Sequence, residues 1–371
     1  MIEYYLGLKE KFKKGELFDP PLIHLLVTNT CNLNCRHCFA ADSTNNIKEN
    51  VDLSFDEYKK ISDSMGRIGM MMVCGGEPFL KKDLTDIVKL FIKNNNVSKI
   101  GLSTNGYAWR QTIPKVEQLV AETDINYSLV FSVDGVKDTH DFIRDHEKRK
   151  SFDKLMVTWE KAKKLESQYP NLSVELSSVV NKYNHEQLDD MYDLFTNTME
   201  ASHIGVLYVR QEQWDKDIKS DISLENYRHY TQRIEDWVYK TAKPKDYLSA
   251  LFKSSQLLMY RIIYDTLKSG EVYMPCVAGK ASVLFDNMGG IYSCEVRKEV
   301  AKLRDNDYDF KKIFYSEAMD TERKAVEVCE HFPCTHETEY LGPSIPFSLP
   351  EHRESELFEI FSRFQPHLET A

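Results

Sequence analysis

The stretch TCNLNCRHCF, residues 30–39, holds Cys31, Cys35 and Cys38 in the spacing Cys-x3-Cys-x2-Cys. It follows the apolar run Leu22–Val27, which predicts a buried strand, so the cysteines should lie in a loop. Three thiolates this close in sequence can converge on one metal centre. A structural zinc site needs four protein ligands, and His37 is a poor fourth because it adjoins Cys38. Three cysteines without a fourth favour instead a [4Fe–4S] cluster with one iron open to a substrate or cofactor.

Composition limits the kind of protein and its compartment. The chain has 371 residues, which indicates two domains or one large domain with an appendage. A net charge of −10 argues against nucleic acid or an anionic membrane as the main partner. No apolar run approaches the ~20 residues of a membrane span, and no signal-peptide core precedes the first strand. We therefore expect a cytoplasmic protein, in which the 8 cysteines bind metal rather than form disulfides.

Apolar runs alternate with amphipathic stretches between residues 21 and 210. The predicted strands are Leu22–Val27, Met70–Cys74, Lys99–Ser103, Asn126–Val133, Ser173–Val180 and Ile204–Val209. The predicted helices are Ser54–Met65, Asp83–Asn94, Ile113–Ala121, Phe152–Ser167 and His185–Thr198. Strict alternation of strand and helix implies right-handed crossovers and a parallel sheet. The fold class is therefore α/β, and six such units suggest an open (β/α)6 barrel with its chemistry at the carboxyl ends of the strands.

The pattern changes in the second half of the chain. Residues Ile222–Gly270 look helical and are expected to bridge two parts. Beyond them, Val283–Phe285 and Ile291–Ser293 flank a turn-rich stretch typical of a hairpin, and the tail beyond Pro350 predicts an amphipathic helix. The expected division is an N-terminal segment at 1–20, a barrel at 21–215, a helical bridge at 216–274, a small domain at 275–340 and a C-terminal helix at 341–371.

The first cysteine cluster resembles the signature of the radical S-adenosylmethionine (SAM) superfamily, Cys-x3-Cys-x-aromatic-Cys, with His37 in the aromatic place. The resemblance covers residues 21–210 and, separately, 275–335. It implies a partial (β/α)6 barrel whose [4Fe–4S] cluster chelates the amino and carboxylate groups of SAM through its open iron. It also implies that an electron from a low-potential donor, such as flavodoxin or ferredoxin, cleaves SAM to methionine and a 5′-deoxyadenosyl radical. That radical would abstract hydrogen from the substrate.

A SAM pocket is implied by motifs at the ends of later strands. Gly75-Gly76-Glu77-Pro78 resembles the family element that binds the SAM amino group, although a plain turn is the alternative. Arg144 resembles an arginine that pairs with the SAM carboxylate, a task suited to guanidinium. Further SAM contacts, with helix capping as the alternative for Ser132 and Asp134, are expected from Ser103, Asn105, Ser132, Asp134 and Val180.

A second cysteine group lies in the last third of the chain. Cys276, Gly289 and Cys294 resemble the Cys-x(9–15)-Gly-x4-Cys hallmark of the SPASM and twitch extensions. With Cys329 and Cys334 they could fully ligate one auxiliary [4Fe–4S] cluster, as expected for the shorter twitch type. A zinc ribbon is the alternative.

The fourth ligand of the second cysteine group has alternatives. The spacing from Cys329 to Cys334 is wider than the usual Cys-x2-Cys, so His331 or His336 could substitute. The remaining cysteine, Cys74, precedes Gly75 on a predicted strand and is expected in the core. A fully ligated auxiliary cluster could accept the electron left on a substrate radical, which would make the reaction a net oxidation.

The sequence leaves several classes of substrate open. Arg210, Gln211 and Glu212 end the sixth predicted strand and are candidates for contacting a sugar, another small molecule or a short peptide. About twenty residues precede the first strand, fewer than a leader-binding domain needs, which favours a small molecule or short peptide. The alternatives are a peptide maturase that cross-links or epimerises a residue, and an Fe–S electron-transfer or SAM-binding protein without radical chemistry.

Overall fold

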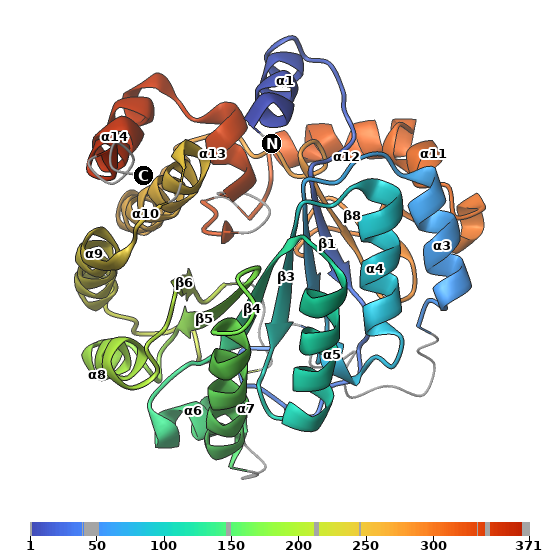
Figure 1. The fold of residues 1–371 in the computed structure, drawn as a ribbon. Coiled ribbons are helices and arrows are strands. Elements are labelled where there is room, and N and C mark those ends of the chain that lie inside the picture. The colour runs from blue at the N-terminus through green and yellow to red at the C-terminus, as the bar shows by residue number, and fades with distance from the viewer. Residues whose placement is uncertain are drawn as a thin grey trace.

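The computed structural model describes residues 2–38, 40, 52–145, 150–210, 215–244, 246–331, 333–337 and 342–365. Its centre is a curved nine-stranded sheet with the strand order β6-β5-β4-β3-β2-β1-β7-β8-β9. Figure 1 shows the helices arranged around the outside of this sheet. Among the described helices, none combines the length and the apolar composition that crossing a membrane requires.

Six parallel strands form the barrel part, and they confirm every strand predicted from the sequence within two residues at each end. They are β1 (Leu22–Leu26), β2 (Met70–Cys74), β3 (Lys99–Thr104), β4 (Asn126–Ser132), β5 (Leu172–Val180) and β6 (Ile204–Tyr208). Adjacent strands pair in sequence order, as right-handed crossovers require. Their inward side chains, such as Val73, Leu102 and Leu129, are fully buried.

The predicted helices are also present. They are α3 (Phe55–Ser64), α4 (Leu84–Asn95), α5 (Trp109–Glu122), α7 (Ser151–Glu166) and α8 (Leu188–Asp193), the last continued by a π-helical turn at Leu194–Thr198. Ser54 and Glu57 form a capping box at the start of α3. Among the described residues up to β6, three elements were not predicted: α1 (Ile2–Lys13), the short 3-10 turn Pro78–Leu80 and α6 (Lys137–Arg144).

Two long helices follow β6, as the sequence predicted. They are α9 (Leu224–Thr241) and α10 (Tyr247–Ser269). The hydroxyl of Tyr260 on α10 donates to the carbonyl of Ile204 at 3.0 Å, which fixes α10 against the start of β6. The pair therefore packs on the barrel beside its last strand (Figure 1).

The predicted hairpin forms, but it continues the barrel sheet. The strand β7 (Ser282–Phe285) pairs antiparallel with β8 (Gly290–Tyr292), and β8 pairs with β9 (Ala301–Lys302). On its other edge β7 pairs in parallel with β1, with Leu22 opposite Ser282. The hairpin therefore shares a sheet with β1, the strand that precedes the loop of Cys31, Cys35 and Cys38.

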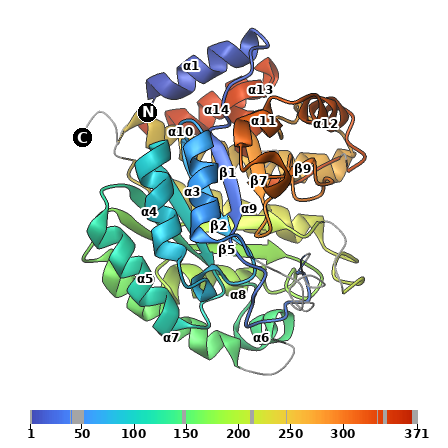
Figure 2. The same ribbon diagram turned by 90° about the vertical axis from the view of Figure 1, so that its right-hand side faces the viewer.

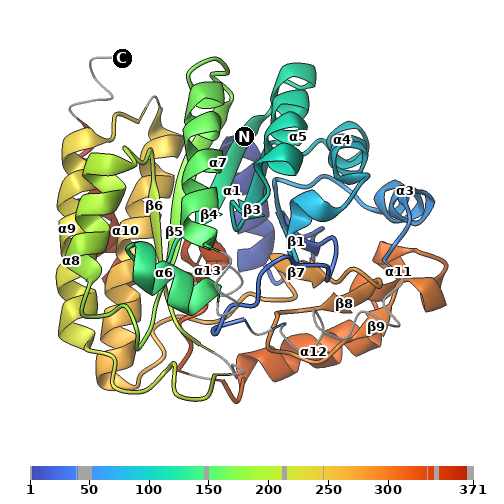
Figure 3. The ribbon, with the colours of Figure 1, turned by 90° about the horizontal axis from the view of Figure 1, so that it is seen from below.

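The remaining elements pack beside the β7-β8-β9 edge of the sheet or at one end of the molecule. They are a 3-10 turn at Arg304–Asn306, α11 (Phe310–Phe314), α12 (Glu317–Glu327), α13 (Gly342–Ser348) and α14 (Glu351–Ser362). Figure 2 shows α11 and α12 beside β7 and β9, with α1 and α13 together at one end of the molecule. Leu8 of α1 and Phe347 of α13 share a small apolar cluster with Val277 and Ala281. Figure 3 views the opposite end, where α6 and the loop after β1 lie.

Candidate functional site

A cavity of about 210 Å³ opens at the carboxyl ends of the barrel strands. It brings together most of the residues that the motifs singled out. They are Cys31, Cys35, Cys38, Gly75, Gly76, Glu77, Pro78, Ser103, Asn105, Ser132 and Arg144. Leu33, Asn34, His37 and Thr104 complete the lining.

The cysteine loop is held in place by α6. The backbone N–H of Arg36 donates to the carbonyl of Ile143 at 2.8 Å, and its Nε donates to the carbonyl of Phe142 at 3.0 Å. The guanidinium also lies over the Phe142 ring at 4.1 Å and pairs with Asp215 at 3.2 Å. Arg36 therefore fixes the loop between Cys35 and Cys38 against two other segments of the chain, α6 and the segment at Asp215.

The three thiols of this loop suit a cluster. Burial raises the pKa of Cys31 to about 11 and raises the pKa values of Cys35 and Cys38 as well. Thiols with such pKa values are protonated at neutral pH unless a metal displaces the proton. Asn105 Nδ2 and Arg144 Nη1 lie 3.9 Å from the sulfurs of Cys31 and Cys35, where they can donate to thiolates.

A [4Fe–4S] cluster takes one cysteine thiolate on each iron that the protein ligates. Three thiols on one loop line the same cavity, and N–H donors of Asn105 and Arg144 lie beside two of the sulfurs. The residues present therefore fit a cluster at Cys31, Cys35 and Cys38.

The two glycines pack against the cysteine loop. Gly75 has a φ of 131°, and a Cβ there would lie 2.4 Å from the carbonyl oxygen of Thr28. A Cβ on Gly76 would lie 2.4 Å from the carbonyl oxygen of Thr30. Backbone N–H groups of Gly76 and Glu77 donate to the same two carbonyls at 2.7 and 2.8 Å. The glycines are therefore required because β2 ends directly against the start of the cysteine loop.

Glu77 is a buried carboxylate with its own donors. It accepts the backbone N–H of Asn105 at 2.8 Å, the hydroxyl of Thr104 at 3.1 Å and the backbone N–H of Phe79 at 3.3 Å. Burial nevertheless raises the pKa of Glu77 to about 7. A cationic group in the cavity would favour the charged carboxylate.

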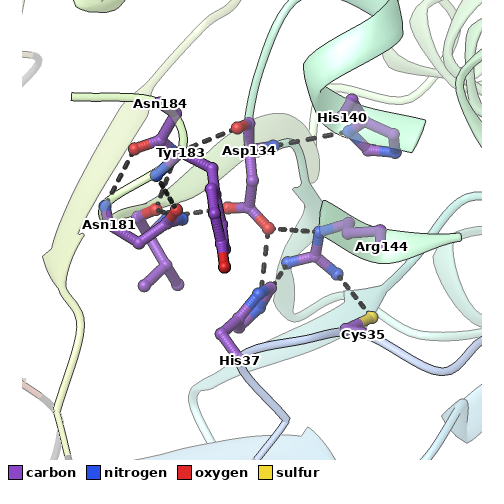
Figure 4. Close-up of polar contacts among 9 residues, drawn as sticks. Cys35, His37, Asp134, His140, Arg144, Asn181, Tyr183 and Asn184 are labelled. Carbon is purple, nitrogen blue, oxygen red and sulfur yellow. Dashed lines mark hydrogen bonds and ion pairs between the residues drawn. The ribbon is translucent and has the colours of Figure 1, made fainter. Parts of the chain in front are cut away.

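Arg144 is anchored by Asp134 (Figure 4). The Nε of Arg144 donates to Oδ2 of Asp134, and His37 Nε2 lies 3.5 Å from the same oxygen. Oδ1 of Asp134 accepts the backbone N–H of Val179 at 2.7 Å. Burial alone would raise the pKa of Asp134, but Arg144 and His37 hold it below its ordinary value. Asp134 is thus a buried anion beneath two side chains that line the cavity.

The other predicted residues at strand ends fall into two groups. Ser103 and Ser132 line the cavity, and the Ser103 hydroxyl also donates to the carbonyl of Val73 at 3.2 Å. Asp134 and Val180 are fully buried and are outside the lining. Cys74 is at the end of β2 and is only partly buried, so the expectation of a core residue is wrong for it.

The second cysteine group also comes together. Burial is the main cause of the rise in the pKa of Cys276 to about 12, and the thiols of Cys294, Cys334 and Cys329 contribute to that rise. Cys294 is buried against Ala278 in a small apolar cluster that Cys276 borders. The four predicted ligands therefore lie in one region of the structure.

The two histidines near Cys334 are placed differently from one another. His336 is buried, and its Nε2 lies 2.8 Å from Oε1 of Glu295, while its backbone N–H donates to the Cys334 sulfur at 3.3 Å. His331 is exposed and lies 3.9 Å from Glu330.

Arg210 contacts two carboxylates. Its guanidinium lies 2.5 Å from Glu337 and 3.1 Å from Glu295. Gln211 and Glu212, the other predicted substrate contacts, lie outside the described residues. Glu295 and Glu337 were not predicted to belong to the site, and the available signal was that each lies within three residues of a predicted ligand.

Comparison with known proteins agrees with this geometry. The radical SAM superfamily model matches residues 25–195. GTP 3′,8-cyclase of Haemophilus ducreyi is 30% identical over 109 residues, which are 29% of this chain and 32% of that protein. Fe-coproporphyrin III synthase of Methanosarcina barkeri is 26% identical over 216 residues, 58% of this chain and 50% of that protein. The chain thus spans a third to a half of these relatives' length.

Two solved structures share the fold over most of the chain. The anSMEcpe structure with bound AdoMet has a TM-score of 0.60 at 16% identity, covering 94% of this chain and 98% of that one. SuiB of Streptococcus suis bound to S-adenosylmethionine has a TM-score of 0.59 at 16% identity, covering 85% and 70%. SuiB has also been solved with its precursor peptide SuiA, and anSMEcpe with a Cp18Cys peptide.

The parallel barrel and the three-cysteine loop define a radical SAM protein. Residues 25–195 are thus a radical SAM domain, the domain of a superfamily of enzymes.

Proposed function

We propose that this protein is a radical SAM enzyme that binds two [4Fe–4S] clusters and oxidises a peptide substrate. The first cluster is held by Cys31, Cys35 and Cys38, with SAM in the adjoining cavity. A second cluster is held by Cys276, Cys294, Cys329 and Cys334. The observation that carries the proposal is the cavity that joins the three thiols to Glu77 and Arg144.

The chemistry of the cavity supports SAM as its ligand. SAM carries an ammonium and a carboxylate on one carbon, and the cavity offers a buried carboxylate at Glu77 and a buried guanidinium at Arg144. When bound, a reduced cluster supplies the electron that cleaves SAM to methionine and a 5′-deoxyadenosyl radical. Glu77 and Arg144 are fixed by their own hydrogen bonds, so SAM would bind with little reorganisation of either side chain.

A peptide is favoured among the polar substrates by the structural relatives. SuiB bound to its precursor peptide SuiA shares the fold over 86% of this chain. The anSMEcpe structure with the Cp18Cys peptide shares it over 95% of this chain. The relatives named GTP 3′,8-cyclase make GTP the second candidate. A low-potential donor such as flavodoxin or ferredoxin would supply the electron.

The first experiment is anaerobic reconstitution with iron and sulfide, followed by SAM, dithionite and measurement of 5′-deoxyadenosine. We expect about eight irons per chain, and 5′-deoxyadenosine formation that is lost in Cys35→Ala. Cys74→Ala is the matched control, because Cys74 is a partly buried thiol outside both cysteine groups. It should keep both the iron content and SAM cleavage.

Two results would contradict the proposal. Formation of 5′-deoxyadenosine by Cys35→Ala at the wild-type rate would remove the cluster from the reaction. Absence of both SAM binding and SAM cleavage in the fully iron-loaded wild-type protein would remove SAM as the ligand. Adding candidate peptides or GTP to the active protein then tests the substrate, because the true substrate should accelerate SAM cleavage.

A further inference from the structure

The end of β6 is connected to the second cysteine group by a cluster of charged side chains. Arg210 lies two residues beyond β6, and the backbone before it is fixed by Val209 N–H donating to the carbonyl of Val180 at 2.9 Å. Glu295 directly follows Cys294, and Glu337 lies three residues after Cys334. The guanidinium of Arg210 contacts both carboxylates, so one side chain joins three segments that are far apart in sequence.

The acidic partners are also tied to each other and to β6. Glu295 Oε1 lies 2.8 Å from Nε2 of His336, which connects the segment after Cys294 to the segment after Cys334. Glu337 Oε1 accepts the backbone N–H of Tyr208 at 3.1 Å, which connects that segment to β6. Side chains of Glu337 and Glu295 are only 5% and 11% exposed, so their charges depend on Arg210 for compensation.

This arrangement assigns Arg210 a different task from the predicted substrate contact. Its guanidinium is occupied by two carboxylates of its own chain, and it is 19% exposed. Nη1 contacts Glu337 and Nη2 contacts Glu295, so the planar guanidinium fixes the direction as well as the distance of both carboxylates, which an ammonium would do poorly. The same charge lies close enough to Cys334 to oppose the rise in the pKa of that thiol, whose main cause is burial.

We propose that Arg210 is a positioning residue that holds both flanks of the second cysteine group against the end of β6. Through Glu295 and Glu337 it sets where that group lies relative to the SAM cavity. In so far as the group holds an auxiliary cluster, the inference rests on the proposed function. The contacts themselves are independent of the cluster.

The test compares Arg210→Gln, Arg210→Lys and Glu337→Gln by backbone hydrogen exchange over residues 290–297 and 333–337. Arg210→Gln should accelerate exchange in both segments roughly ten- to hundredfold, because charge-assisted hydrogen bonds are lost. Arg210→Lys should give an intermediate result. The matched control is Arg233→Gln, since Arg233 on α9 also bridges two carboxylates, Asp189 and Asp193, away from the cysteines. It should leave both segments unchanged.

A second readout separates positioning from substrate binding. The midpoint potential or EPR signal of the auxiliary cluster should shift in Arg210→Gln, while SAM cleavage remains. Unchanged exchange in both segments would overturn the inference, and a raised substrate KM with unchanged exchange would restore Arg210 as a substrate contact. A wild-type iron content of about four would instead contradict the auxiliary cluster. The exchange data would still decide the role of Arg210.

Discussion

Asp134 is a buried anion on which the cavity depends, although it does not line the cavity. It anchors the guanidinium of Arg144 and faces His37, and both of those side chains line the cavity. The sequence placed Asp134 and Ser132 together at the end of a strand. It could not tell which of them faces the cavity, because that depends on how the backbone turns after β4.

Asp134→Asn should weaken both folding and SAM binding. The buried guanidinium of Arg144 would lose its counter-charge, so we expect about 3 kcal/mol of lost stability and roughly tenfold weaker SAM binding. Denaturant unfolding and a SAM binding titration measure the two effects. Asp153→Asn is the control, since Asp153 forms an exposed pair with Lys137. Equal effects of the two substitutions would contradict a special role for Asp134.

Glu77 and Arg210 illustrate what residue type alone leaves open. Both were predicted to contact ligands, and both have partners within the chain. Glu77 keeps its place in the cavity lining, whereas the guanidinium of Arg210 is committed to Glu295 and Glu337. A motif fixes which side chains are present, but their partners come from segments that the motif does not contain.

Among the elements, α6 does most to build the site and was not predicted. Its 8 residues include Arg144 and the two carbonyls that hold Arg36. A helix of two turns gives too short a pattern for apolar periodicity to be recognised, and no side chain caps its start. The longer helices α4, α5 and α7 were predicted because their apolar faces repeat over three or more turns.

The start of α3 makes a prediction about acid stability. Glu57 accepts from Arg304 at 2.7 Å, which ties this capping box to the C-terminal part. That hydrogen bond is the main reason the pKa of Glu57 is lowered to about 2. A lowered pKa stabilises the fold fully above the ordinary value, and the contribution is lost as pH falls toward 2.

Glu57→Gln should therefore cost about 1 kcal/mol of stability at pH 7, a value that allows for solvent screening. The difference from wild type should shrink as the pH falls from 5 to 2. Unfolding curves measured across that range test this. A difference that is the same at every pH would show that the charge of Glu57 contributes nothing.

On the scale of the whole molecule, the proposed function gives the two cysteine groups separate roles. Cys329→Ala should lower the iron content from about eight to about four per chain and reduce product formation. SAM cleavage should remain measurable, because Cys31, Cys35 and Cys38 are unaffected. Cys74→Ala is again the control. Full product formation by Cys329→Ala would contradict the role of the second cluster as electron acceptor.

The order of the barrel strands was predictable, but the position of the hairpin was not. Strict alternation indicates a parallel sheet, and the expected barrel implies the sequential pairing that is found from β1 to β6. The apolar runs Val283–Phe285 and Ile291–Ser293 indicate a local antiparallel pair. They do not indicate which other strand the first of them pairs with. The pairing of β7 with β1 depends on packing across more than half of the chain.

That pairing has a consequence for the order of synthesis on the ribosome. The apolar strand Leu22–Leu26 is made early, and its partner Ser282–Phe285 emerges only after about 250 more residues, which is roughly 10 to 50 s of translation. Until then one edge of β1 has unpaired backbone groups that can pair with another nascent chain. Slow or crowded expression should therefore favour aggregation through this strand, and chaperone binding early in translation should suppress it.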